Sequence, residues 1–112
     1  MTPALRAALH SELDRAAVAR AAGDPAQAFR HLERAHILSQ RHTLWHVRVH
    51  WRMLRLGWLR RDGREVRGQL LRIPAALLFS RIWIPLGNTG GADVSPTRPM
   101  PVPEDLKGPL GL

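Results

Sequence analysis

One helix ends and another begins within Ala21-Ala-Gly-Asp-Pro-Ala-Gln-Ala-Phe-Arg-His-Leu-Glu-Arg-Ala35. Gly23 is typical of the position after a helix, because glycine adopts a left-handed backbone conformation at little cost. Asp24, Pro25 and Gln27 then follow in the order of an N-cap, a proline at the first helical position and a third residue able to reach back to the cap. The stretch therefore predicts an α-helical hairpin that turns at residues 23–24.

The helix before this turn is predicted to begin at Thr2–Pro3, where proline is well tolerated. The helix after the turn extends to about residues 39–40, and a break near residues 41–43 separates it from a third helix that ends near Arg60. The first helix has apolar residues at three- and four-residue intervals, which predict its buried face. These residues are Leu5, Leu9, Leu13 and Ala16.

A fourth helix is predicted from Asp62-Gly-Arg-Glu65, which repeats the capping pattern. Pro74 lies inside this helix and is expected to kink it or to end its regular part. The predicted apolar stripe of this helix consists of Val66, Leu70, Ile73 and Leu77. The fold class is therefore all-α, with four helices in two antiparallel hairpins.

The rest of the chain is rich in proline and glycine, which predicts an extended tail rather than a second packed domain. Gly87-Asn-Thr-Gly-Gly91 within it is expected to form turns. We thus expect a helical domain over residues 1–82. The tail, residues 83–112, is expected to pack on this domain or to trail from it.

Composition excludes several classes of protein. The chain has 112 residues, 45% of them hydrophobic, as expected for one small folded domain. It has no cysteine, which excludes disulfides, thiolate zinc sites, iron–sulfur clusters and a cysteine nucleophile. No signal peptide is expected, and Arg72, Pro74 and Pro85 interrupt the most apolar stretch, so we expect a cytoplasmic protein without a transmembrane segment.

Two resemblances accompany these patterns. Residues 21–35 resemble a tetratricopeptide hairpin, because Gly23, Ala28, Phe29 and Ala35 fall at its small and bulky positions. Other motifs cover nearly the whole chain: Leu32-Glu-Arg-Ala-His-Ile-Leu-Ser-Gln40, His46-Val-Arg-Val-His-Trp-Arg-Met-Leu54, Arg61-Asp-Gly-Arg-Glu-Val-Arg-Gly-Gln69, Gly87-Asn-Thr-Gly-Gly-Ala-Asp-Val-Ser95 and Pro99-Met-Pro-Val-Pro-Glu-Asp-Leu106. In these motifs the chain resembles a small bacterial family described as domain of unknown function 3703. The resemblance implies a cytoplasmic, one-domain helical protein and implies no activity.

The third predicted helix places basic and imidazole side chains on different sides. Its arginines, Arg48, Arg52 and Arg55, share one arc, which predicts the solvated face. His46 and His50 lie on the opposite side, four residues apart, where two imidazoles can share a ligand. The stripe that flanks them is expected to face the core. It consists of Leu44, Val47, Trp51, Leu54 and Trp58.

The second helix carries Glu33 and His36 at the Glu-x-x-His spacing of helical carboxylate metal sites. An antiparallel turn near residues 41–42 would place His36 level with His46 and Glu33 level with His50. The predicted metal ligands are therefore Glu33, His36, His46 and His50. The residues predicted to support them are Glu12, Gln40 and Met53. Without sulfur, this set would suit Zn²⁺, Fe²⁺, Mn²⁺, Cu²⁺ or Ni²⁺.

Two other roles remain open for these inward side chains. One is a structural hydrogen-bond network in which Glu33 accepts from an imidazole, and the other is acid–base catalysis. The remaining histidines, His10, His31 and His42, are expected to be exposed rather than ligating.

The net charge of +8 favours an acidic partner. Arg48, Arg52 and Arg55 are the predicted contact residues for an acidic protein, and the tryptophan-rich third helix also allows a homodimer. Nucleic acid is disfavoured, because the chain contains no helix-turn-helix or RNA-binding motif. Two functions follow from these patterns: a non-catalytic protein that binds a metal ion or metal cofactor, and a tetratricopeptide-like interaction module with structural histidines.

Overall fold

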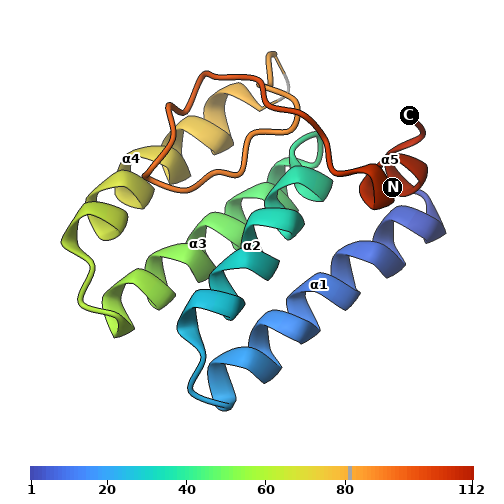
Figure 1. Ribbon diagram of the computed structural model, residues 1–112. Helices are drawn as coiled ribbons and strands as arrows, with labels where there is room; N and C mark the ends of the chain where they lie inside the picture. The colour runs from blue at the N-terminus through green and yellow to red at the C-terminus, as the bar shows by residue number, and fades with distance from the viewer. Residues whose placement is uncertain (81) are drawn as a thin grey trace.

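The computed structural model describes residues 1–80 and 82–112. Within these residues, five α-helices and no strands are present: α1 (Pro3–Ala21), α2 (Pro25–Ser39), α3 (Thr43–Leu59), α4 (Gly63–Phe79) and α5 (Glu104–Leu110). The first four helices lie side by side, and the chain after α4 returns past α3 and α2 to α5, near the start of α1 (Figure 1). None of the helices in the described part is long and apolar enough to cross a membrane.

The helix starts lie where the capping residues predict them. Thr2 Oγ1 accepts a hydrogen bond from the Leu5 backbone N–H at 3.1 Å. Asp24 and Asp62 accept equivalent bonds, from residues 27 and 65, at 3.0 and 3.1 Å. These side chains satisfy backbone donors that have no partner inside the helix. Gly23 has φ +77°, the left-handed conformation predicted for the end of the first helix.

The main core lies between α1, α2 and α3. Its largest fully buried apolar side chains are Leu9, Leu38, Val49 and Met53. α4 packs against α3, whereas α5 contacts α1 and α2. The core therefore holds α2 and α3 together along the hairpin that carries the predicted ligands.

The prediction of four helices and an extended tail is corrected by α5. The tail contains this seven-residue helix, with Glu104 and Asp105 in its first turn, where carboxylates oppose the positive end of a helix. Leu106 enters the core and is 3% exposed, and Arg34 of α2 forms an ion pair with Asp105. Burial of one leucine and this ion pair stabilise a short helix that composition alone does not reveal.

The predicted core stripe of α3 is wrong. Trp51 and Trp58 are 53% and 73% exposed, Leu44 is also exposed, and Val47 and Leu54 are half-buried. The side of α3 that faces α2 and α4 instead carries His46, His50, Val49, Met53, Leu56 and Gly57. α2 and α4 cover only part of the apolar surface of α3, so Trp51 and Trp58 remain exposed to solvent.

The predicted stripe of α4 is also wrong. Leu70 and Leu77 are more than half exposed, whereas the polar residues Glu65 and Gln69 are buried. The helix continues through Pro74 to Phe79, so the proline does not end it. α4 turns polar side chains inward because Gln69 binds His50 and Glu65 accepts from the Ala92 N–H of the returning chain.

Candidate metal centre

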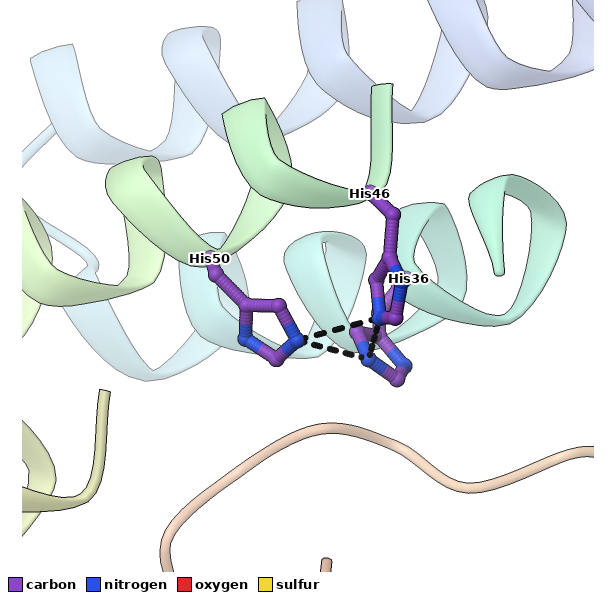
Figure 2. Close-up of side chains that lie close together, drawn as sticks. All are labelled: His36, His46 and His50. Atoms are coloured by element: carbon purple, nitrogen blue, oxygen red, sulfur yellow. Dashed lines mark hydrogen bonds between the residues drawn. The ribbon is translucent and has the colours of Figure 1, made fainter. Parts of the chain in front are cut away.

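Three imidazoles from two helices meet inside the protein. His36 lies on α2, and His46 and His50 lie four residues apart on α3, with exposed fractions of 3%, 7% and 3%. The Nε2 atom of His36 lies 2.9 Å from that of His46 and 3.1 Å from that of His50, and the last two are 3.1 Å apart. Figure 2 shows the three rings turning these nitrogens toward one point.

The helical hairpin explains this convergence. Residues four apart lie on one side of a helix, which brings His46 and His50 together. The antiparallel register predicted that His36 lies level with His46, and the 2.9 Å contact between their nitrogens confirms it. Local spacing and one turn are thus sufficient to assemble the three rings.

The outer nitrogens of two rings define their protonation. His36 Nδ1 lies 2.7 Å from the backbone oxygen of Asn88, and His50 Nδ1 lies 2.6 Å from Gln69 Oε1. Both oxygens only accept hydrogen bonds, so each Nδ1 donates a proton. The Gln69 orientation is fixed, because its Nε2 donates to Glu65 at 2.6 Å and to the Gly90 backbone oxygen at 2.8 Å. In the neutral rings, Nε2 of His36 and Nε2 of His50 therefore carry only lone pairs.

Burial keeps the rings neutral. It lowers the pKa of His36 well below the ordinary value, that of His46 to about 3 and that of His50 to about 4, and the neighbouring rings add to the effect at His36 and His46. Neutral imidazole is the form that binds a metal ion.

Three neutral rings cannot form a hydrogen bond at each of the three Nε2–Nε2 contacts, because too few of these nitrogens carry a proton. Between His36 and His50, two lone pairs face each other at 3.1 Å without a proton. A proton on His46 Nε2 could be donated fully to only one neighbour, and the buried Nδ1 of His46 has no hydrogen-bond partner among the described residues. A cation at the common point would bind all three lone pairs at once.

The spacing fits a small transition-metal ion. Metal–nitrogen bonds of about 2.0–2.1 Å separate tetrahedral nitrogen ligands by roughly 3.3 Å, slightly more than the spacing found here. A small outward movement of the rings would admit an ion, which His36, His46 and His50 would hold through their Nε2 atoms. Three ligands on one side leave a fourth coordination position on the other.

Glu33 does not join the three imidazoles. It is half-buried and lies outside the cluster. Burial raises the pKa of its carboxyl group, and the negative charges of Asp93 and Glu65 raise this pKa further. The position beside His50 that register assigned to Glu33 is occupied by Gln69 of α4. Equal height along two helices does not fix the direction of a side chain, and the candidate ligands brought together are the three histidines.

The three predicted supporting residues have different positions. Met53 Sδ lies 3.4 Å from Gln69 Nε2, beside the centre. Gln40 binds the returning chain instead, donating to the Pro85 backbone oxygen at 2.9 Å and accepting from the Gly87 N–H at 3.0 Å. Glu12 lies apart from the centre and forms ion pairs with Arg34 at 2.9 Å and with His31 at 2.7 Å. His31 was expected to be exposed, but it is half-buried in this contact.

Sequence reasoning missed Gln69, Asn88 and Gly90. A Cβ at Gly90, which has φ +81°, would lie 2.4 Å from His36 Cδ2, so this glycine lets the chain cover the ring. The available signals were the glycine-rich turn and the polar pair Glu65 and Gln69, four residues apart among leucines. Neither signal identifies which helix its residues contact.

Among the described residues, the fold and this centre define a small all-α protein with a buried cluster of three histidines that could hold a metal ion. A family model described as Protein of unknown function (DUF3703) matches residues 3–110, and the chain belongs to this family. The family resemblance found in the sequence is thereby confirmed. No curated protein and no solved structure gives a significant match.

Proposed function

We propose that the protein binds a divalent transition-metal ion through His36, His46 and His50. The observation that carries the proposal is the convergence of three buried Nε2 atoms within 3.1 Å of one another, two of them without a proton in the neutral rings. Nitrogen ligands suit Zn²⁺, Cu²⁺, Ni²⁺ and Fe²⁺, whereas Mn²⁺ favours carboxylates, and Glu33 lies outside the cluster.

The outer ring nitrogens of His36 and His50 make hydrogen bonds of the kind found at metal sites. Ligating histidines donate the other ring N–H to a carbonyl or carboxylate, which fixes the ring and raises its basicity. His36 donates to the Asn88 carbonyl and His50 to Gln69, whose amide in turn donates to the Glu65 carboxylate. A purely structural network explains these outer bonds but leaves the inner lone pairs of His36 and His50 opposed.

Metal content tests the proposal. The full chain is purified without a polyhistidine tag after growth with added zinc, and elemental analysis measures bound metal. We expect a single ion per chain, lost in His36→Gln and in His46→Gln. His10→Gln is the matched control, because His10 is exposed and lies outside the cluster. A folded wild-type chain that takes up none of Zn²⁺, Cu²⁺, Ni²⁺ or Fe²⁺ would refute metal binding and leave the histidines a structural role.

A second function, docking of an acidic protein partner in the manner of a tetratricopeptide-like module, is supported by the surface of α3 and α4. A groove there is lined by Trp51, Leu54, Trp58, Val66 and Leu70, together with Arg55. We infer that its occupant is an acidic segment with apolar anchors, since Arg48 and Arg52 are exposed on the same helix and the chain carries a net charge of +8.

A peptide library tests this second function. Acidic peptides with apolar anchors are selected on wild-type protein and then measured against Trp58→Ser. Binding that falls with salt and with this substitution is expected. The inferred charge complementarity would be contradicted if Arg55→Gln bound the selected peptides as tightly as the wild type does. It would also be contradicted if the library selected basic peptides as often as acidic ones.

A further inference from the structure

A cavity of about 280 Å³ lies against the histidine cluster. All three imidazoles line it, so the cluster has an accessible side. Most of the remaining wall is apolar, including Phe79, Trp83 and Ile84. The centre is therefore not a closed structural site but opens toward a space large enough for a small molecule.

Arg72 brings a cation into this wall. It is half-buried, and it makes no ion pair within 4.0 Å among the described residues. Its Nη2 donates to the Val94 backbone oxygen at 2.9 Å, whereas its buried Nε–H has no acceptor. Arg72 lines the same cavity as His36, His46 and His50, so its guanidinium and the three imidazoles border one space.

These features have a common chemical consequence. Three imidazoles on one side of a metal ion leave a fourth coordination position, and an oxyanion can occupy it. A guanidinium presents several N–H donors in a plane, which matches a carboxylate better than a point charge does. The apolar wall excludes water and favours a ligand with an apolar body, and the volume is near the lower end of the roughly 300–1,000 Å³ typical of ligand pockets.

We propose that this cavity binds a small organic carboxylate, with its carboxylate between the bound metal ion and Arg72 and its apolar part against Phe79 and Trp83. The inference rests on the proposed metal binding. It adds the chemical class of the ligand and assigns Arg72 as the residue that selects an anion.

Cobalt-loaded protein provides a direct test. The visible absorption of bound Co²⁺ reports changes in its ligands, and sodium benzoate, sodium acetate and sodium sulfate are the probes. We expect benzoate to change the spectrum saturably and to bind more tightly than acetate, because only benzoate has a large apolar part. Sulfate is expected to bind more weakly than benzoate.

Variants of two arginines separate the role of Arg72 from a general charge effect. Arg72→Gln is expected to weaken benzoate binding at least about tenfold, because a charged hydrogen bond is lost, while cobalt content stays unchanged. Arg67→Gln removes the same charge from an exposed position of α4, and its benzoate affinity should equal that of the wild type. If Arg72→Gln does not fold, Trp83→Ala serves instead: it should weaken benzoate but not acetate.

The outcomes distinguish this inference from the proposed function. A folded chain without cobalt refutes the metal site itself. Bound cobalt whose spectrum is unchanged by benzoate, or benzoate affinity that is equal in Arg72→Gln and Arg67→Gln, overturns the carboxylate site and leaves metal binding intact. Sulfate that binds as tightly as benzoate overturns the assignment of an organic ligand.

Discussion

Gln69 determines how His50 presents its inner nitrogen. Its Oε1 accepts from His50 Nδ1, and its Nε2 is held by Glu65 and by the Gly90 backbone oxygen. The amide therefore cannot reverse without opposing donors to donors and acceptors to acceptors. A single buried side chain of α4 thus selects the tautomer of a candidate ligand on α3.

Replacement of this amide should weaken metal binding without removing a ligand. Gln69→Met keeps a side chain of similar length but removes the acceptor of His50 Nδ1, and losses of about 10–100-fold in metal affinity are typical for such partners. Competition with a chromophoric zinc chelator measures the change. Gln27→Met, on the partly exposed side of α2, should bind zinc as the wild type does, and an equal loss in both variants would contradict the assigned role.

The three rings also predict how stability depends on pH in the metal-free protein. Unfolded histidines have a pKa near 6.5, whereas burial lowers the pKa of His46 to about 3 and that of His50 to about 4 in the folded state. As pH falls below about 6.5, the unfolded chain binds protons that the folded rings do not, so the free energy of unfolding decreases. Each ring contributes a slope of up to about 1.4 kcal/mol per pH unit until its folded pKa is reached.

Urea unfolding of metal-free protein at pH 7.5, 6.0 and 5.0 measures this slope. Stability should be nearly constant above pH 7.5 and fall steadily below pH 6.5. His46→Gln should show a shallower decline, since one buried titrating ring is absent. A wild-type midpoint that rises on acidification would contradict the assignment of neutral buried rings.

Residue-level prediction succeeded where contacts are local. The four-residue spacing of His46 and His50 and the register of one hairpin are sufficient to bring three candidate ligands together. Glu33 and Gln69 show where the same reasoning stops. Which of them reaches His50 depends on how α4 and the returning chain pack against the hairpin, and no local spacing contains that information.

At the scale of elements, the segment from Gly87 to Ala92 closes one side of the cluster. Asn88 accepts from His36 through its backbone oxygen, and its side chain donates to the backbone oxygens of Ser95 and Arg98. The Ala92 N–H binds the Glu65 carboxylate at 3.1 Å. This segment therefore couples α2 and α4 although it has no regular secondary structure.

Gly90 is the residue of this segment whose added Cβ would lie against a ring of the cluster. Gly90→Ala would place a methyl group 2.4 Å from His36 Cδ2 and would hold alanine at φ +81°. We expect it to destabilise the protein by about 1–3 kcal/mol and to displace His36, which lowers zinc affinity as well. Thermal unfolding and chelator competition measure both effects.

Gly108→Ala is the matched control for this substitution. Gly108 lies in α5, and no atom lies within 4 Å of its added Cβ. Stability and zinc affinity are expected to be unchanged or slightly increased in this variant. Equal behaviour of the two alanine variants would show that close packing of Gly90 on His36 does not position the ring.

Element boundaries were largely predictable, and so was the buried face of α1, where Leu5, Leu9, Leu13 and Ala16 are all buried as expected, whereas the apolar stripes predicted for α3 and α4 were wrong. The caps at Thr2, Asp24 and Asp62 bond to neighbours three residues away, so sequence alone locates the first turns of three helices. The faces of α3 and α4 depend on distant neighbours. Glu65 and Gln69 are buried because imidazole and backbone groups of other segments satisfy them, while the leucines of α4 remain exposed.

At the scale of the whole molecule, the apolar groove of α3 and α4 and the positive charge have opposite effects on self-association. Burial of Trp51, Trp58 and Leu70 against a second copy would be favourable. A net charge of +8 on each copy, with the exposed Arg55 lining the groove, opposes that contact. Salt screens the repulsion, because the Debye length falls from about 10 Å at 0.1 M to about 3 Å at 1 M.

The chain should therefore be monomeric at low salt and associate as salt increases, which sedimentation at 20 mM and 800 mM sodium chloride measures. Trp58→Ser should suppress the high-salt association. Val18→Ser, which removes an equally exposed apolar side chain from α1, should not. The charges that separate two basic copies are the same charges that would attract an acidic segment. Dimers that are strongest at low salt would therefore contradict the expected charge repulsion between copies and the inferred acidic partner.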